Sequence, residues 1–425
     1  MADTLDCRPE LSADWSGEHD EKSAAWFELF LDLVMVAAFS SVAQKLKIDF
    51  TINGYLTFIL IATLYVSSWH AYTHFNGRFN ESSLVHYFFL YGLLVGIGIM
   101  VLSSKPSFRF TMGLLVTRIA VICMNLAVYN LLPKVRDRLR EDIALLCMSI
   151  FVLCFALLVE KYTIHAYILV IIIEVILHYE IRIRHWFVRP ATAIPVNTEH
   201  VREREASLVL VALGEAVVSA VVNTQRICTP LSLQFYAMMQ LSMLITFSMA
   251  AFYFAVQPPG ATHTITRTIR RASYYTMLHV ILVCVILSLG VSMKFIADAV
   301  FYDRLVAIPH VGLLYGSMII CMLLILGLRW LHYWDTRPSN LSPFSKRIIF
   351  WWWGVMFFWL VLPLLSVISF IKFSPGGVHP LTALGIAAAC MVVWLVTETF
   401  VMHYLSQLNQ DASQEPELSP LILAK

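Results

Sequence analysis

Ionisable side chains interrupt several long apolar stretches of this sequence. Glu28 and Asp32 are four residues apart in WFELFLDLVMVAAFSSVAQKL, so a helix places both carboxylates on one face. Arg118, Glu174 and Glu215 lie near the middle of three other apolar stretches. A charge at the centre of a membrane helix costs about 2.5–3.5 kcal/mol, so each of these groups needs a partner, water or a function.

The acids in these stretches outnumber the one base. Arg118 can neutralise one or two of the carboxylates, and we expect it to pair with Asp32. The others must then be protonated, hydrated or bound to a cation, which predicts a substrate or ion pathway with a titratable carboxylate. Glu28 is closer to its helix end, where we expect it to reach water as a gate or as an N-terminal charge favoured by the helix dipole. The alternative is a set of structural ion pairs that lock helices together.

Further polar residues share helix faces with these charges. Asn125 lies seven residues after Arg118, which predicts a polar stripe that faces protein rather than lipid. Ser219 is one turn beyond Glu215, and His178 is one turn beyond Glu174. We expect these neighbours to support the charged groups.

The composition indicates the elements that must position these residues. The chain has 425 residues, of which 59% are hydrophobic and only 14% are charged, whereas a soluble domain has about 25% charged residues. This composition is typical of a polytopic helical membrane protein. The sequence therefore predicts an all-α transmembrane bundle of about twelve spans. These spans are 25–46, 51–73, 83–103, 110–132, 142–160, 163–182, 205–224, 232–256, 274–296, 311–331, 347–371 and 380–405.

The predicted spans form one membrane domain, 25–405, between a polar N-terminal tail, 1–24, and a C-terminal tail, 406–425. The longest polar connection, 183–204, would divide the domain into halves 25–182 and 205–405. Such halves would suit a transporter built from two repeats, although the similarity between the first and seventh spans is more simply a coincidence of composition.

The distribution of positive charge predicts the orientation. Twenty of the thirty Lys and Arg residues fall on the side of the N-terminus and the even-numbered loops. Because cytoplasmic loops carry the excess of Lys and Arg, we expect both termini in the cytoplasm. We expect the protein in the plasma membrane, with an organelle membrane as the alternative.

Motifs for several other functions are missing from the sequence. It has no phosphate loop, dinucleotide fingerprint, HExxH or GxSxG, so we expect neither an enzyme nor a bound cofactor. His70 and His74 are four residues apart and could share a metal, but no third ligand is evident, and hydrogen-bonded histidines are the better interpretation. The expected partners are the lipid bilayer and an unidentified small molecule or ion, with a homo-oligomer left open and no nucleic acid.

Four segments carry a resemblance to a known family. They are WFELFLDLVMVAAFSSVAQKL, SSWHAYTHFNGRFNESSLVHYFFLYGLL, GLLVTRIAVICMNLAVYN and NTEHVREREASLVLVALGEAVVSAV. In this order they resemble the low temperature requirement A (LtrA) family over nearly the whole chain. The resemblance implies a membrane fold and a set of charged positions rather than a particular activity. Those positions are Glu28, Asp32, Arg78, Arg118, Glu203, Arg204 and Glu215.

The sequence departs from the family pattern at two places. The family's Arg-Phe-Gly is Arg204-Glu205-Ala206 here, and its His-x-Pro is His279-Val280-Ile281. These changes affect the beginning of the seventh span and the ninth span.

These observations predict a secondary transporter coupled to protons or another cation. Asp32 or Glu215 would take up and release the ion, while Arg118 would hold an anionic group or tune the carboxylates. A cation channel and a non-transporting structural or stress-related membrane protein are the alternatives. The candidate binding or coupling residues are Asp32, Arg118, Glu215, Glu174 and Glu28, supported by Glu203, Arg204, Arg78, Asn125, Ser219 and His178.

Overall fold

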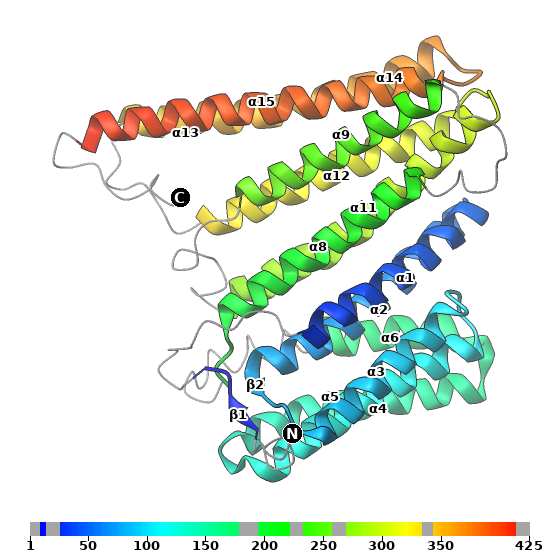
Figure 1. Ribbon diagram of the computed structural model, residues 1–425, viewed down its shortest axis with the longest axis vertical. Coiled ribbons are helices and arrows are strands. Elements are labelled where there is room, and N and C mark those ends of the chain that lie inside the picture. The colour runs from blue at the N-terminus through cyan, green and yellow to red at the C-terminus, as the bar shows by residue number, and fades with distance from the viewer. Residues whose placement is uncertain are drawn as a thin grey trace. The chain divides into compact units, whose positions relative to one another are not determined.

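A computed structural model describes residues 9–13, 26–177, 194–221, 233–256, 269–333 and 343–413. Nearly all of these residues are helical, which confirms the all-α prediction (Figure 1). Among them, ten helices are long and apolar enough to cross a membrane. A polytopic helical bundle therefore fits the described part of the chain, while the predicted orientation of the termini stays a prediction.

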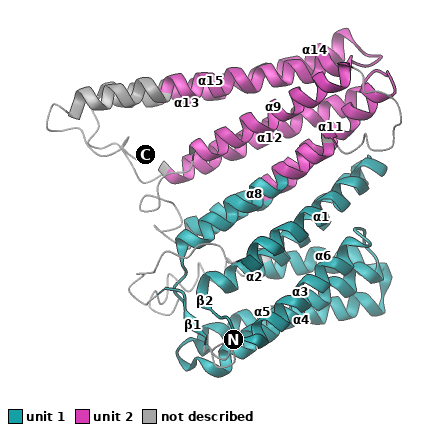
Figure 2. Ribbon diagram, viewed as in Figure 1, with its two compact units in different colours: residues 1–212, 268–280 teal, residues 213–267, 281–425 magenta. Residues whose placement is uncertain are grey.

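The chain divides into two compact units (Figure 2). The first unit comprises residues 1–212 and 268–280. Its described elements include short 3₁₀ turns, a π-helical turn and the first parts of two helices, α8 and α11, that continue into the second unit. The helices are α1 (Trp26–Ile48), α2 (Ile52–Arg78), α3 (Leu84–Val101), α4 (Phe108–Leu131), α5 (Arg136–Leu158), α6 (Thr163–Ile171), α8 (Thr198–Val221) and α11 (Ile269–Phe301). The 3₁₀ turns are η1 (Pro133–Val135) and η2 (Glu160–Tyr162), and the π-helical turn is η3 (Ile172–Leu177).

Hydroxyl side chains mark where three helices of the first unit begin. Thr51, Ser83 and Ser107 precede α2, α3 and α4, and each side chain accepts a hydrogen bond from a backbone N–H in the first turn. Such caps satisfy donors that have no partner within the helix. Two of the capped helices, α2 and α4, line the cavity described below.

A short antiparallel strand pair lies at the end of α2. Strand β1 (Glu10–Leu11) pairs with β2 (Phe79–Asn80), which directly follows α2. The backbone N–H of Ser12 also donates to the carbonyl of Arg78, at 2.8 Å. Part of the segment predicted as a polar tail therefore holds the end of α2.

The second unit comprises residues 213–267 and 281–425. Within it, α9 packs against α12 and α15, and α12 packs against α14. Besides the ends of α8 and α11, its described helices are α9 (Leu233–Val256), α12 (Ile308–Tyr333), α13 (Pro343–Trp359), α14 (Val361–Phe373) and α15 (Pro380–Ser413).

The predicted span 347–371 is two helices rather than one. The break at Leu360 lies three residues before Pro363. A proline ring clashes with the carbonyl four residues earlier and leaves it without an N–H partner, which explains a break at this position.

Two helices extend beyond the predicted spans 205–224 and 274–296. Helix α8 begins at Thr198, and α11 runs from Ile269 to Phe301. As a result, two cations that the sequence analysis assigned to span ends or loops, Arg204 and Lys294, lie well inside helices. The predicted span 163–182 coincides with α6 and η3 as far as Leu177, and most of the predicted connection 183–204 lies outside the described residues.

Helices α3 and α4 approach each other closely at two glycines. A Cβ added to Gly113 would lie 2.6 Å from the carbonyl oxygen of Gly96, and a Cβ on Gly96 would lie 2.8 Å from the carbonyl oxygen of Gly113. Small residues allow such backbone contact between membrane helices.

We expect Gly113→Ala to lower the free energy of unfolding by about 1–3 kcal/mol, because the backbone that it meets cannot yield without moving a helix. Gly98→Ala is the matched control, since a Cβ there meets nothing within 4 Å. Denaturant titration in detergent micelles, followed by circular dichroism, measures both changes. Equal effects of the two substitutions would contradict the close contact.

Candidate functional site

Oppositely charged side chains pair inside both units. In the described helices, both residues of each pair are buried or nearly buried. The two residues of each pair lie far apart in the sequence. The pairs are Asp32–Arg204, Glu28–His200, Glu174–Arg118, Asp142–Arg78, Glu205–His70, Glu215–Lys294 and Glu398–Arg329. The expected surplus of acids is therefore wrong, because bases on α8, α11 and α12 and histidines on α2 and α8 compensate them.

Arg118 holds Glu174 in a two-point contact. Its Nε donates to Oε1 at 2.6 Å, and its Nη2 donates to Oε2 at 2.6 Å. The hydroxyl of Ser67 donates to Oε2 at 2.8 Å, and Ser68 accepts from Nη1 at 2.9 Å. Two parallel N–H···O bonds of this kind make a strong, geometrically specific contact between an arginine and a carboxylate. The prediction that Arg118 neutralises one of the central acids is confirmed for Glu174.

Asp32 pairs with Arg204 instead of Arg118. Arg204 donates from Nη1 to Oδ2 at 2.7 Å and from Nη2 to Oδ1 at 2.6 Å. The indole Nε1 of Trp69 donates to Oδ1 at 2.8 Å, and the guanidinium lies 5.2 Å from the centre of that ring. The predicted Asp32–Arg118 pair is wrong because α8 begins earlier than expected and brings Arg204 into the helix interior.

Glu28 is buried rather than open to water. Its carboxylate accepts a hydrogen bond from the amide of Asn76 at 2.8 Å and lies 3.0 Å from Nε2 of His200, and the residue is 0% exposed. Arg204 also donates to its backbone carbonyl, at 3.2 Å. The expectation of a water-accessible gate is therefore wrong, and Glu28 joins α1 to α2 and α8.

Glu215 belongs to a separate cluster in the second unit. Lys294 donates to Oε1 at 3.1 Å, and so does the hydroxyl of Ser219, also at 3.1 Å. Gly290 makes room for this contact, because a Cβ there would meet the backbone of Ala216 at 3.0 Å. Lys294 was not predicted as a site residue, because it lies near the end of the predicted span 274–296.

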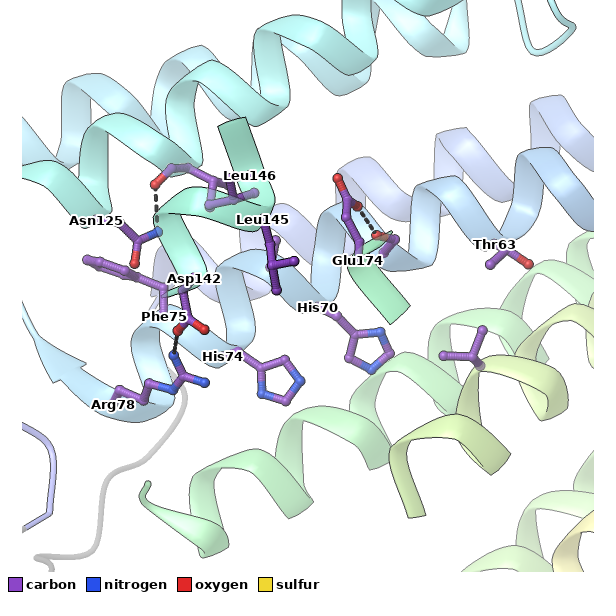
Figure 3. Close-up of a pocket in the computed structure, with 14 residues that line it drawn as sticks. Thr63, His70, His74, Phe75, Arg78, Asn125, Asp142, Leu145, Leu146 and Glu174 are labelled. Atoms are coloured by element: carbon purple, nitrogen blue, oxygen red, sulfur yellow. Dashed lines mark hydrogen bonds and ion pairs between the residues drawn. The ribbon is translucent and has the colours of Figure 1, made fainter. Parts of the chain in front are cut away.

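A cavity of about 110 Å³, lined by both polar and apolar side chains, lies in the first unit along one face of α2. The cavity-lining residues of α2 recur every three or four positions, as one helix face requires. They are Thr63, Ser67, His70, Ala71, His74, Phe75 and Arg78. Asn125, Asp142 and Glu174 line the cavity from α4, α5 and η3 (Figure 3).

The cavity brings together only some of the predicted site residues. Glu174, Asn125 and Arg78 line it, whereas Asp32, Arg118 and Glu215 are not among its lining residues. Asn125 donates to the carbonyl of Val121 at 2.8 Å. Of the predicted binding or coupling residues, only Glu174 therefore lines this cavity.

The remaining predicted residues differ in their surroundings. Glu203 is exposed on α8, and His178 lies outside the described residues. Thr111, Arg118 and Asn125 are all buried, which confirms the predicted polar stripe on α4.

Three contributors to the site were not predicted as site residues. Asp142 accepts a hydrogen bond from Arg78 at one end of the cavity. It was not predicted because it is the first residue of the predicted span 142–160, where a charged residue was interpreted as the end of the span. His70 was noted only for its spacing from His74. Glu205 was noted only as a departure from the family pattern, and a charged residue at an apolar position was the signal that could have identified it.

A comparison with known families matches residues 23–405 to the family described as "Bacterial low temperature requirement A protein (LtrA)". The chain belongs to the LtrA family. The match extends from the start of α1 into α15, so the resemblance seen in four segments is confirmed over nearly the whole length. No curated protein matches the chain. Together with the ten apolar helices, the LtrA match identifies an integral membrane protein.

In this LtrA family member we expect Arg204→Met to lower the free energy of unfolding by about 3–5 kcal/mol, because it leaves the Asp32 carboxylate buried and unpaired. Adding Asp32→Asn should restore part of that loss. A double-mutant cycle in detergent micelles measures the coupling energy. The matched cycle combines Asp32→Asn with Arg118→Met, for which we expect a much smaller coupling. Equal couplings in both cycles would contradict the observed pairing.

Proposed function

We propose that the protein is a secondary transporter, coupled to protons or another cation, and that the α2 cavity binds its substrate. We place it in the plasma membrane, since its family is described as bacterial. The proposal is supported by a cavity among apolar helices whose lining includes ionisable side chains, because ionisable groups within membrane segments typically mark substrate or ion pathways.

The observation that carries the proposal is the position of Glu174. Its side chain is 11% exposed and lines the cavity, whereas the side chain of its partner Arg118 is 0% exposed. The carboxylate of Glu174 is paired with Arg118, which does not line the cavity. It therefore presents negative charge to the cavity while the arginine stays paired. Glu174 also lies in the π-helical turn η3, and such turns are frequent at functional sites.

The two ion pairs at the cavity give a substrate a way to change the helix arrangement. Arg78 on α2 contacts Asp142 on α5, and Glu174 on η3 contacts Arg118 on α4. A substrate with a carboxylate or an ammonium group would compete for one of these partners. Because a ligand shifts a conformational equilibrium only through different contacts in the two states, such competition would couple binding to helix movement.

We expect Glu174→Gln to lower the initial rate of coupled transport by at least about tenfold, since a charge-assisted hydrogen bond contributes about 1.5–3 kcal/mol and each 1.36 kcal/mol of barrier changes the rate tenfold. Proteoliposomes that contain a pH-sensitive dye would receive pools of amino acids, organic cations and organic anions. At least one pool should produce a pH change inside wild-type vesicles. Glu160→Gln is the matched control, because Glu160 is exposed and lies outside the cavity lining.

The pairing of the buried acids listed above with bases favours a second candidate, a non-transporting structural protein whose charges only lock helices together. The charge swap Arg118→Glu with Glu174→Arg separates the two functions. A transporter should regain stability in the double variant relative to either single variant, but not transport, because the charge that faces the cavity is reversed. Thermal unfolding in detergent and flux in proteoliposomes measure both properties. Full recovery of transport would contradict a role for Glu174 in the cavity.

A further inference from the structure

Glu205 of α8 is a buried carboxylate in a cluster of histidines. It is 0% exposed, and its Oε1 lies 2.9 Å from Nε2 of His70 on α2. His279 and Thr276 of α11 also lie within interaction distance of its carboxyl group. The ring of His279 is held by the carbonyl of Tyr275, which is 2.8 Å from Nδ1. Three helices of the first unit therefore meet around one acid.

His70 connects this acid to the cavity. The His70 side chain is 9% exposed and lines the cavity, whereas Glu205 is not among the lining residues. One ring nitrogen, Nε2, faces Glu205, which leaves Nδ1 on the other side of the ring. A histidine placed in this way can exchange protons with the cavity at one nitrogen and with a carboxylate at the other.

The Glu205–His70 pair differs in kind from the arginine pairs around it. Glu174 and Asp32 are each held by a guanidinium that does not release its proton, so neutralising either acid would leave an uncompensated cation. In the Glu205–His70 pair both partners can bind and release protons. The net charge of the pair can therefore change by one unit without leaving an arginine unpaired.

The Glu28–His200 pair offers the same chemistry but a different position. Arg204 lies 3.9 Å from the Glu28 carboxylate, and neither Glu28 nor His200 is among the residues that line the cavity. Protons in the cavity therefore meet His70 and not His200.

Polar side chains continue from His70 along the cavity face of α2. The rings of His70 and His74 are stacked, with 5.7 Å between their centres (Figure 3). His74 is one turn from Arg78, which contacts Asp142. One helical turn rises about 5.4 Å, a distance that one water molecule can bridge between polar groups. The cavity has room for several waters, since each needs about 10–15 Å³.

We propose that Glu205 binds the proton that drives the transport cycle and that His70 passes this proton between Glu205 and the cavity. The inference rests on the proposed function and identifies its coupling ion. In the loading step a proton from cavity water forms a bond to Nδ1 of His70. The Nε2–H bond breaks as its proton joins Oε1 of Glu205, so His70 ends neutral in its other tautomer. The release step reverses both transfers.

Other titratable and charged groups lie near His70 and Glu205 and influence these proton transfers. His74 on α2 and His279 on α11 are titratable and face the pair. The edge of Trp69 contacts His70 and links it to the Asp32–Arg204 pair, which is neutral as a whole and keeps its charges. The histidines around Glu205 therefore form the part of this cluster that responds to pH.

Infrared difference spectroscopy on the purified protein in lipid nanodiscs tests proton binding without any substrate. Acidification should produce the C=O band of a protonated carboxyl group. We expect one component of the band to be lost in Glu205→Gln, to persist in Glu174→Gln, and to persist with a shifted midpoint pH in Glu205→Asp, which also shows that a substituted chain folds. Persistence of the full band in Glu205→Gln would overturn the inference.

Flux measurements in proteoliposomes test whether this proton drives transport. With the substrate pool that moves in the wild type, we expect proton movement to fall at least tenfold in Glu205→Gln and in His70→Gln. His165→Gln and Glu160→Gln are the matched controls, because both residues are exposed and outside the cavity lining. Coupled proton movement at the wild-type rate in Glu205→Gln would overturn the inference while leaving a transporter.

The two experiments separate the failure of this inference from the failure of the proposed function. If the infrared band belongs to Glu205 but no substrate pool moves in wild-type vesicles, Glu205 is a proton site and the transporter proposal fails, together with the role of this proton in coupling. If a pool moves with protons and the band belongs to another residue, the transporter stands and Glu205 is not its proton site.

Discussion

The need to neutralise charge within apolar helices is the constraint on which this structure depends. A carboxylate buried there is stable when a base from another helix reaches it, so each pair also fixes how two helices lie. Asp32 with Arg204 joins α1 to α8, and Glu174 with Arg118 joins η3 to α4. In the second unit Glu398 of α15 contacts Arg329 of α12 and the indole of Trp352 on α13. Such pairs supply specificity that apolar packing between lipid-facing helices does not.

The choice of base separates two kinds of pair. Guanidinium groups pair with Asp32, Asp142 and Glu174, and because a guanidinium does not release its proton, these contacts suit a fixed framework. Imidazoles accompany Glu28 and Glu205, and an imidazole, unlike a guanidinium, can release its proton. The same electrostatic requirement thus allows both permanent and switchable contacts within one unit.

The sequence predicted the helical elements well and the pairing of side chains poorly. Apolar length identifies a membrane helix by itself, which is why the positions of α1 to α4 agree closely with the expected spans, whereas α5 begins at Arg136, before the predicted start at 142. Pairing depends on which helix faces meet, and no local pattern contains that information. The positions of residues within the predicted spans favoured Arg118 as the partner of Asp32. The partner in the structure, Arg204, lies near the start of α8, which is polar and was predicted to be part of a loop. Glu205 was overlooked for the same reason.

The π-helical turn η3 has a consequence for how the cavity tolerates change in chain length. A π turn closes its hydrogen bonds over one more residue than an α turn. Removal of one residue from Ile172–Leu177 would let the backbone return to α geometry. Because the wider turn takes up the extra residue, the helix on either side would keep nearly the same direction, whereas side chains within the turn would be redirected. The contact between Glu174 and Arg118 therefore depends on the number of residues in this turn as well as on their types. A conservative substitution beside Glu174, by contrast, would leave its direction unchanged.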